Sequence, residues 1–186
     1  MVPQQWLART TAPGVHADDR RRLDLVLYGA TRRGEALCCD VTLVSPLRAD
    51  GRPHTGAADR DGVALQTARR RKAARYPELD RPGPQRLVVL AAEVGGRWGD
   101  EVAGLVRDLV RMRALRAPVA LRRPASAGWH RRWWGLLSCA LQRAMASTLL
   151  GAWRAPAMPA AEGGPALAEV VALADQSGPS RLPLRS

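Results

Sequence analysis

The chain has 186 residues, of which 46% are hydrophobic, and a formal net charge of +12. This length is sufficient for one globular domain with a real hydrophobic core. The first residues lack a basic region followed by an apolar one, so we expect no secretory signal there. The three cysteines have no C-x-x-C spacing, which argues against a zinc site and favours packing in a reducing compartment.

The positive charge is typical of proteins that bind nucleic acid. Of the 29 basic residues, however, 28 are arginine, and isoleucine, asparagine and phenylalanine are absent. This drift toward arginine inflates the charge, and a membrane surface or an acidic partner would fit it equally well. Lys72 is the only lysine, which indicates a position where arginine cannot replace the function of lysine. Survival of this lysine by chance is the alternative.

Two short apolar runs predict a pair of strands, after an irregular lead-in over 1–20 that can add one more. The runs are LDLVLYG, which contains Asp24, and ALCCDVTLV, which contains Asp40. The loop over 29–35 predicts an antiparallel hairpin. If the loop is centred on Arg32, Asp24 lies opposite Asp40 on the same face of the sheet. Two facing carboxylates repel each other, and a divalent cation held between them would remove that conflict.

A helix is predicted over 62–76, with Asp61 as its N-cap and Pro77 as its stop signal. Five basic side chains give this helix a strongly positive surface: Arg69, Arg70, Arg71, Lys72 and Arg75. Such a surface is usually only solvated, but beside two acids it can hold phosphate groups. For Tyr76, one turn after Lys72, packing is favoured over chemistry.

The second half of the chain predicts one more strand and two longer helices. RLVVLAAEV reads as a buried strand that ends near Glu93. Glu93 is a candidate third metal ligand, although a structural or surface role is favoured. Helices are predicted over 101–115, capped by Asp100, and over 129–153, where apolar residues recur at helical spacing. Gln142 and Arg143 interrupt the second apolar run, which therefore predicts a packing helix and no membrane span.

Positive charge continues through this second half. From Arg107 to Arg154 there are ten arginines and one acid, a net charge of +9. Trp133 and Trp134 directly follow two of these arginines and can stack on bases, although core packing is the favoured interpretation. Residues 154–186 are rich in Pro, Ala and Gly and predict a disordered tail or linker with one weak helix near 167–174.

An ordered set of segments resembles a known family: RLD, then CDVTLVSP, then ARRRKAARYPEL, then VVLAAEVGGRWGDE. Together they are similar to the restriction-endonuclease-like domains of non-LTR retrotransposon polyproteins, which lie downstream of a reverse transcriptase and belong to the PD-(D/E)XK superfamily. The resemblance runs over about residues 22–150. Asp24 matches the acid of the family's Arg-Pro-Asp, although Leu23 replaces the proline. Asp40 matches the second acid, and Thr42 stands where a lysine is typical. Lys72 matches a lysine displaced onto the following helix.

The resemblance implies an α/β fold, a small mixed sheet that starts with an antiparallel hairpin and is flanked by helices, within one endonuclease-like domain over 21–153. It implies a nuclear, metal-dependent DNA endonuclease that nicks target DNA for retrotransposition. Asp24, Asp40 and the carbonyl of Val41 would hold Mg²⁺ or Mn²⁺, and Lys72 would act on the attacking water or the transition state. The expected partner is DNA, with an upstream reverse transcriptase domain or retrotransposon RNA as further candidates, and no membrane. The alternative is a catalytically inactive nucleic-acid-binding relic.

Overall fold

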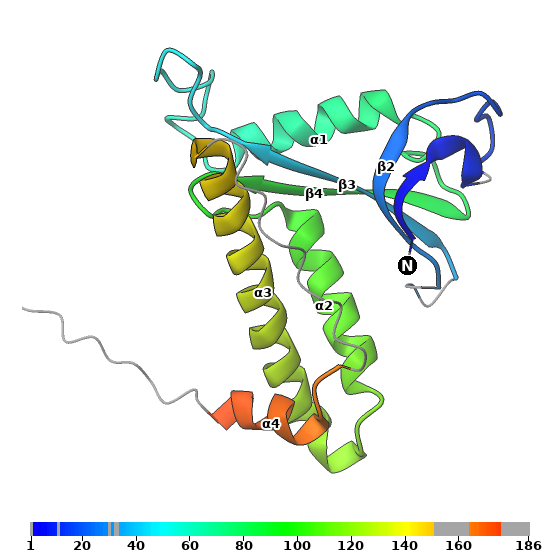
Figure 1. Cartoon of the computed structure of the whole chain (residues 1–186), viewed down its shortest axis with the longest axis vertical. Coiled ribbons are helices and arrows are strands. Elements are labelled where there is room, and N and C mark those ends of the chain that lie inside the picture. Colours follow the sequence, from blue (N-terminus) through cyan, green and yellow to red (C-terminus); the bar gives the residue numbers. More distant parts are fainter. Residues whose placement is uncertain (1, 11, 30, 32–33, 151–163, 176–186) are drawn as a thin grey trace, which may run out of the picture. The chain divides into compact units, whose positions relative to one another are not determined.

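The computed structural model describes residues 2–10, 12–29, 31, 34–150 and 164–175 (Figure 1). These residues form an α/β fold, as predicted, with one four-stranded mixed sheet and helices that include one near the C-terminal end. The chain divides into two compact units. We call Met1–Leu105 the sheet unit and Val106–Ser186 the helical unit. The boundary falls inside the stretch predicted as a single domain, 21–153.

The sheet has the order β1-β2-β3-β4. Its strands are β1 (Val2–Trp6), β2 (Arg22–Leu27), β3 (Ala36–Val44) and β4 (Gln85–Glu93), and a 3-10 turn, Leu7–Arg9, follows β1. β1 pairs antiparallel with β2, so the lead-in does add a strand, and β2 pairs antiparallel with β3. β3 and β4 are parallel, which requires the crossover that helix α1 (Val63–Arg75) provides.

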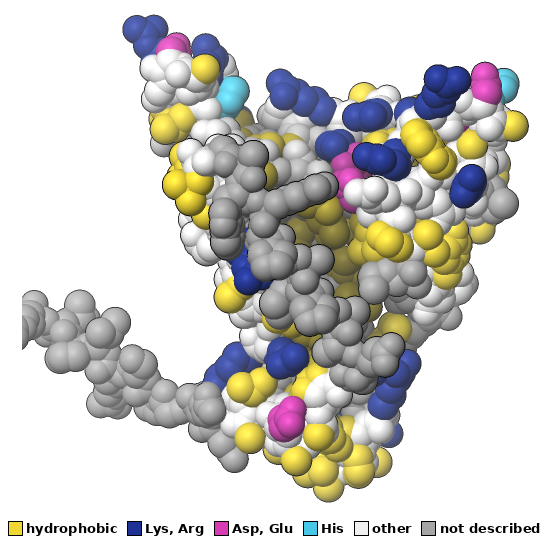
Figure 2. Space-filling view, in the orientation of Figure 1, with side chains coloured by type: hydrophobic (Ala, Val, Ile, Leu, Met, Phe, Trp, Pro, Cys, Tyr) yellow, Lys and Arg dark blue, Asp and Glu magenta, His cyan; other side chains and the backbone are white. Residues whose placement is uncertain are grey.

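Helix α1 lies within one residue of the predicted range at both ends, but its N-cap differs. Its N-cap is Gly62, which has a φ of 73° and no side chain to offer, so the predicted cap, Asp61, was wrong. Asp61 is drawn instead into an ion pair with Arg97, with 2.8 Å between Oδ1 and Nη2. Figure 2 shows Lys and Arg side chains gathered over α1, with far fewer acidic ones among them.

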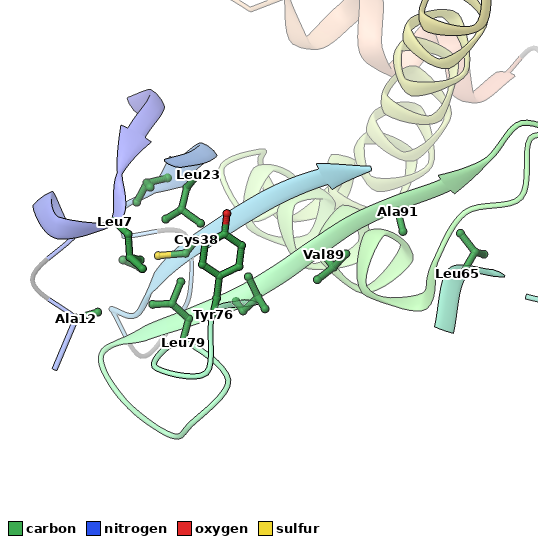
Figure 3. Close-up of a cluster of buried hydrophobic side chains, with 12 residues drawn as sticks. Leu7, Ala12, Leu23, Cys38, Leu65, Tyr76, Leu79, Val89 and Ala91 are labelled. Carbon is green, nitrogen blue, oxygen red and sulfur yellow. The ribbon is translucent and has the colours of Figure 1, made fainter. Parts of the chain in front are cut away.

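Two cores cover opposite faces of the sheet. The larger one lies on the α1 side and includes Leu23, Cys38, Tyr76 and Leu79, all essentially buried (Figure 3). The smaller one contains Leu37, Cys39 and Val88. Cys38 and Cys39 therefore point to opposite faces, as strand alternation predicts. Because both faces are covered, the first five residues of β3 are all buried, whereas a half-buried strand was expected.

Helix α2 (Asp100–Ala114) starts in the sheet unit and continues into the helical unit. Asp100 is its first residue, with its carboxylate in the first turn, where a negative charge is favourable. The helical unit also contains a 3-10 turn (Val119–Leu121) and the helices α3 (Arg122–Leu150) and α4 (Leu167–Asp175).

The predicted packing helix over 129–153 corresponds to α3, which begins seven residues earlier. Trp129 and Leu141 are buried, while Leu136 and Leu149 on the same helix are exposed. No helix in the described part of the chain is long and apolar enough to cross a membrane. The weak helix expected near 167–174 is α4, whereas most of the predicted disordered tail lies outside the described residues.

Candidate active site

The hairpin register brings the two candidate carboxylates together. The paired residues are Leu25 with Cys39, Val26 with Cys38 and Leu27 with Leu37. One further step along this register places Asp24 opposite Asp40, as predicted. At this step the ladder ends, and Asp24 Oδ2 accepts a hydrogen bond from the backbone N–H of Val41 at 2.8 Å. The exposed Asp24 carboxylate thus replaces a strand partner and is fixed beside Asp40.

Asp40 is 4% exposed and lies on the α1 face of the sheet. Lys72, 32 residues later, donates a hydrogen bond from Nζ to Asp40 Oδ1 at 2.6 Å. The side chain of Lys72 is partly exposed at 21%, so its ammonium group connects the buried acid to the surface. This ammonium compensates the charge of Asp40 whether or not a cation binds, so repulsion between the two acids does not by itself require a metal.

Tyr76, one helical turn after Lys72, is fully buried beneath these residues. Its hydroxyl donates to the carbonyl oxygen of Arg22 at 3.0 Å, two residues before Asp24. Burial, with a further effect from nearby Asp40, raises the pKa of Tyr76 to about 12, so its hydroxyl is a neutral donor at physiological pH. Lys72 and Tyr76 therefore attach one face of α1 to β3 and β2, respectively, and set the spacing of the two acids.

Arg21 locks the end of α1 against the start of β2. Its guanidinium forms ion pairs with Asp19 and Glu78, each at 2.6 Å, and donates to the carbonyl oxygen of Arg75. It also lies 5.7 Å from the centre of the Tyr76 ring. Hydrogen bonds from Arg21 lower the pKa of both Asp19 and Glu78. Because both pKa values are lowered in the folded state, the two ion pairs stabilise the fold at pH values above the ordinary carboxylate pKa. This stabilisation is lost as pH falls through the lowered pKa values.

The predicted phosphate-binding arginines of α1 have different environments. Arg69 is held in two ion pairs, with Asp80 at 2.6 Å and with Glu101 at 2.8 Å. Arg70, Arg71 and Arg75 are exposed. The structure therefore leaves these three side chains accessible to a polyanion and gives Arg69 a packing role.

Glu93, the alternative third ligand, is buried and lies 3.5 Å from Arg97 across a tight turn. This contact agrees with the favoured structural role. Among the described residues no cluster of three or more His, Cys, Asp or Glu side chains is placed to hold a metal ion. A metal at this site would depend on two carboxylates, the backbone and water or substrate.

The donor atoms that are present do fit a hard cation. Mg²⁺ is commonly held by one or two carboxylates together with waters and phosphate oxygens. Asp24 uses only Oδ2 in its bond to Val41, and Asp40 uses Oδ1 in its bond to Lys72. The carbonyl of Val41 follows Asp40 directly in β3, and the residue is 54% exposed.

The packing role favoured for Tyr76 is confirmed by its burial in the core, whereas its hydrogen bond to Arg22 and the role of Arg21 were not predicted. A signal for Tyr76 was present, because it follows Lys72 by four residues and so lies on the same helical face. No comparable signal marks Arg21, whose partners Glu78 and Arg75 are more than 50 residues away in the chain.

Comparison of the chain with protein-family models, curated proteins and solved structures gave no significant match. The family resemblance therefore stays a prediction, and the fold class rests on the structure alone.

Proposed function

We propose that the sheet unit hydrolyses phosphodiester bonds in DNA with the help of Mg²⁺ or Mn²⁺. The observation that carries the proposal is the convergence of Asp24, Asp40 and Lys72 from three elements onto one end of the β2–β3 hairpin. Two acids and a lysine at this spacing are the constellation that the resemblance to restriction-endonuclease-like domains implies. Retrotransposon DNA nicking in the nucleus, beside an upstream reverse transcriptase, is the corresponding biological role.

The environments of Asp24, Asp40 and Lys72 indicate a different role for each residue. Asp24 is exposed and Asp40 is buried, so Asp24 faces the incoming substrate while Asp40 anchors the inner side of the site. Bound Mg²⁺ would polarise the phosphate and lower the pKa of a water molecule. Lys72 is held by Asp40 and has further N–H hydrogens, which it can donate to the water or to the developing negative charge.

The exposed arginines of α1 supply the attraction to DNA. Arg70, Arg71 and Arg75 lie on the helix that carries Lys72. Arginines near phosphate groups release counterions on binding, so affinity should fall steeply with salt concentration.

A catalytically inactive nucleic-acid-binding relic is the second candidate. It is favoured by the burial of Asp40, whose side chain is 6% exposed and already engaged by Lys72. A carboxylate in this position is also a satisfactory structural element. Salt-sensitive DNA binding without cleavage is the expected behaviour of such a relic.

Nicking of supercoiled plasmid by the purified full chain tests the proposal. We expect relaxed circles with Mg²⁺ or Mn²⁺ and none with EDTA. Asp24→Asn is the sharpest variant, because the amide oxygen can still accept the Val41 N–H bond while the negative charge is lost. It should abolish nicking and any Mg²⁺-dependent rise in melting temperature, with the metal-free melting temperature nearly unchanged.

Asp59→Asn is the matched control, because Asp59 is an exposed loop carboxylate. It removes the same charge and should leave nicking intact. Nicking that persists in EDTA, or that survives Asp24→Asn, would exclude the metal-dependent mechanism. Salt-sensitive DNA binding with no nicking under any condition would favour the relic.

A further inference from the structure

The helical unit contains a cavity of about 380 Å³ lined by α2, α3 and the segment that leads into α4. Leu109 and Met112 of α2 give it an apolar wall, and Trp129 and Trp133 of α3 give it an aromatic one. Gly164 closes one side with bare backbone. A Cβ atom at this position would lie 2.9 Å from Nη2 of Arg113, the flexible end of a side chain that also lines the cavity.

The aromatic wall has one covered ring and one available ring. Trp129 is buried and lies 5.9 Å from Trp133, centre to centre, with the two rings tilted by 58°. Trp133 is only partly buried, so part of its surface faces the cavity. Trp134 turns elsewhere and donates from Nε1 to Nε2 of His130 at 3.1 Å. Trp133 is therefore the ring of this pair that can stack on a ligand.

Arginines surround the same cavity. Arg113 lies 4.9 Å from the centre of the Trp129 ring, and Arg116 and Arg132 also line the cavity. None of its lining residues in the described part of the chain is acidic. Arg131, beside Arg132 in the sequence, instead donates to the carbonyl oxygen of Leu173 in α4 at 2.7 Å. The cavity thus combines an aromatic surface with three arginines, and none of its described lining residues is acidic.

This combination fits a base with phosphate groups on either side. A base stacks on an aromatic ring through its flat face, and guanidinium groups bind the phosphates on either side. Bases of double-stranded DNA are already stacked and paired, so their faces are not available. We propose that the helical unit binds single-stranded nucleic acid at this cavity, with a base on Trp133 and the adjacent phosphates on Arg116 and Arg132.

This site is separate from the proposed nuclease site, because every residue that lines it belongs to the helical unit. The binding proposal does not rest on the proposed function and can be tested in a chain that cleaves nothing. In a chain that does nick DNA, such a site would hold a displaced strand or an RNA template.

Fluorescence anisotropy with the full chain and a labelled oligo-dT tests the proposal, against an abasic oligonucleotide of equal length. We expect oligo-dT to bind more tightly than the abasic strand. Trp133→Leu should weaken oligo-dT binding by roughly 5- to 100-fold, the usual effect of losing one base–aromatic stack, and bring it to the level of the abasic strand.

Because Trp133 packs on Trp129, a second variant avoids the risk of misfolding. Arg116→Gln with Arg132→Gln should weaken both ligands and reduce the salt dependence of oligo-dT binding. The matched control is Arg123→Gln with Arg143→Gln, which removes two exposed arginines of α3 outside the cavity. We expect the control to retain most of the affinity.

Three results would overturn the proposal. Equal affinity for oligo-dT and the abasic strand would show that charge alone drives binding. Equal losses from the two double variants would show that the cavity has no special role. An acidic peptide that binds the parent chain as tightly as oligo-dT, and loses affinity on Trp133→Leu, would assign the cavity to a protein partner.

Discussion

The two units use their arginines in opposite ways. The sheet unit has 17 basic and 13 acidic residues, a net charge of +4, whereas the helical unit has 12 and 4, a net charge of +8. The ion pairs of Arg21, Arg69, Lys72 and Arg97 all lie in the sheet unit. In the helical unit, Arg113 packs over an aromatic ring, and Arg122 and Arg131 donate to backbone carbonyls.

The two units thus differ in what their basic residues do. In the sheet unit they connect secondary-structure elements through ion pairs, and in the helical unit their excess is available to bind a partner. In the sheet unit, the ion pairs of Arg21, Arg69 and Lys72 connect elements that are far apart in the sequence. In the helical unit, basic residues outnumber acidic ones three to one, which costs some self-repulsion but favours association with a polyanion. The basic composition of this chain thus serves structural ion pairing in one unit and favours binding of a polyanion in the other.

The largest expected effect comes from removing the cation of the buried pair. Lys72→Met leaves the Asp40 carboxylate buried without its cation, and we expect it to lower the free energy of unfolding by about 3 kcal/mol. Arg113→Met, in the helical unit, removes a cation–π contact and should cost less than about 1 kcal/mol. Urea unfolding followed by circular dichroism measures both changes.

The double variant Lys72→Met with Asp40→Asn is the control, because it removes both charges together. It should recover part of the stability that Lys72→Met loses. A loss from Arg113→Met as large as that from Lys72→Met would remove the proposed contrast between the two units.

Much of the sheet unit could be predicted from the sequence. The apolar runs around Asp24 and Asp40 predicted the two strands, and the assumed loop centre at Arg32 gives the register that the structure has. The single lysine indicated a special position, and Lys72 does contact Asp40. Whether these residues perform catalysis stays a prediction.

What could not be predicted depends on tertiary contacts or on local geometry without a sequence signal. The unit boundary falls within α2, a continuous helix whose one glycine, Gly104, does not interrupt it and so marks no linker. Glu101 accepts the Val89 N–H of β4 at 2.6 Å, a contact that only the fold creates. For Trp133 and Trp134 a signal existed, since neighbours on a helix point about 100° apart and cannot share one ligand face.

The next largest effect concerns two glycines in α3. A Cβ atom at Gly128 would lie 1.8 Å from the carbonyl oxygen of Val170, so α3 and α4 meet there through bare backbone. Gly128→Ala should force the helices apart and lower the free energy of unfolding by about 1–3 kcal/mol. At Gly135 nothing lies within 4 Å, and Gly135→Ala should stabilise the helix by roughly 0.5–1 kcal/mol. Thermal melts of both variants measure these changes in stability. Equal changes in melting temperature would show that α4 does not pack on α3 as described.

The smallest effect on stability, and the sharpest separation of the two units, comes from the cysteines. Cys38 and Cys39 are fully buried in the sheet unit, while Cys139 on α3 is exposed. Burial raises the pKa of Cys38 to about 11 and, with smaller effects from neighbouring charges, that of Cys39 to about 12. At pH 8 a thiol reagent should therefore label one cysteine of the native chain rapidly and all three only in denaturant.

Because the folded state keeps these two protons after the unfolded state has released them, stability should fall as pH rises from about 9 through both raised pKa values. Cys139→Ser should abolish the rapid labelling and leave this alkaline loss unchanged. Rapid labelling of Cys38 or Cys39 at pH 8 would show that the sheet unit unfolds locally and often. The ion pairs would then not be sufficient to keep its core inaccessible to the reagent.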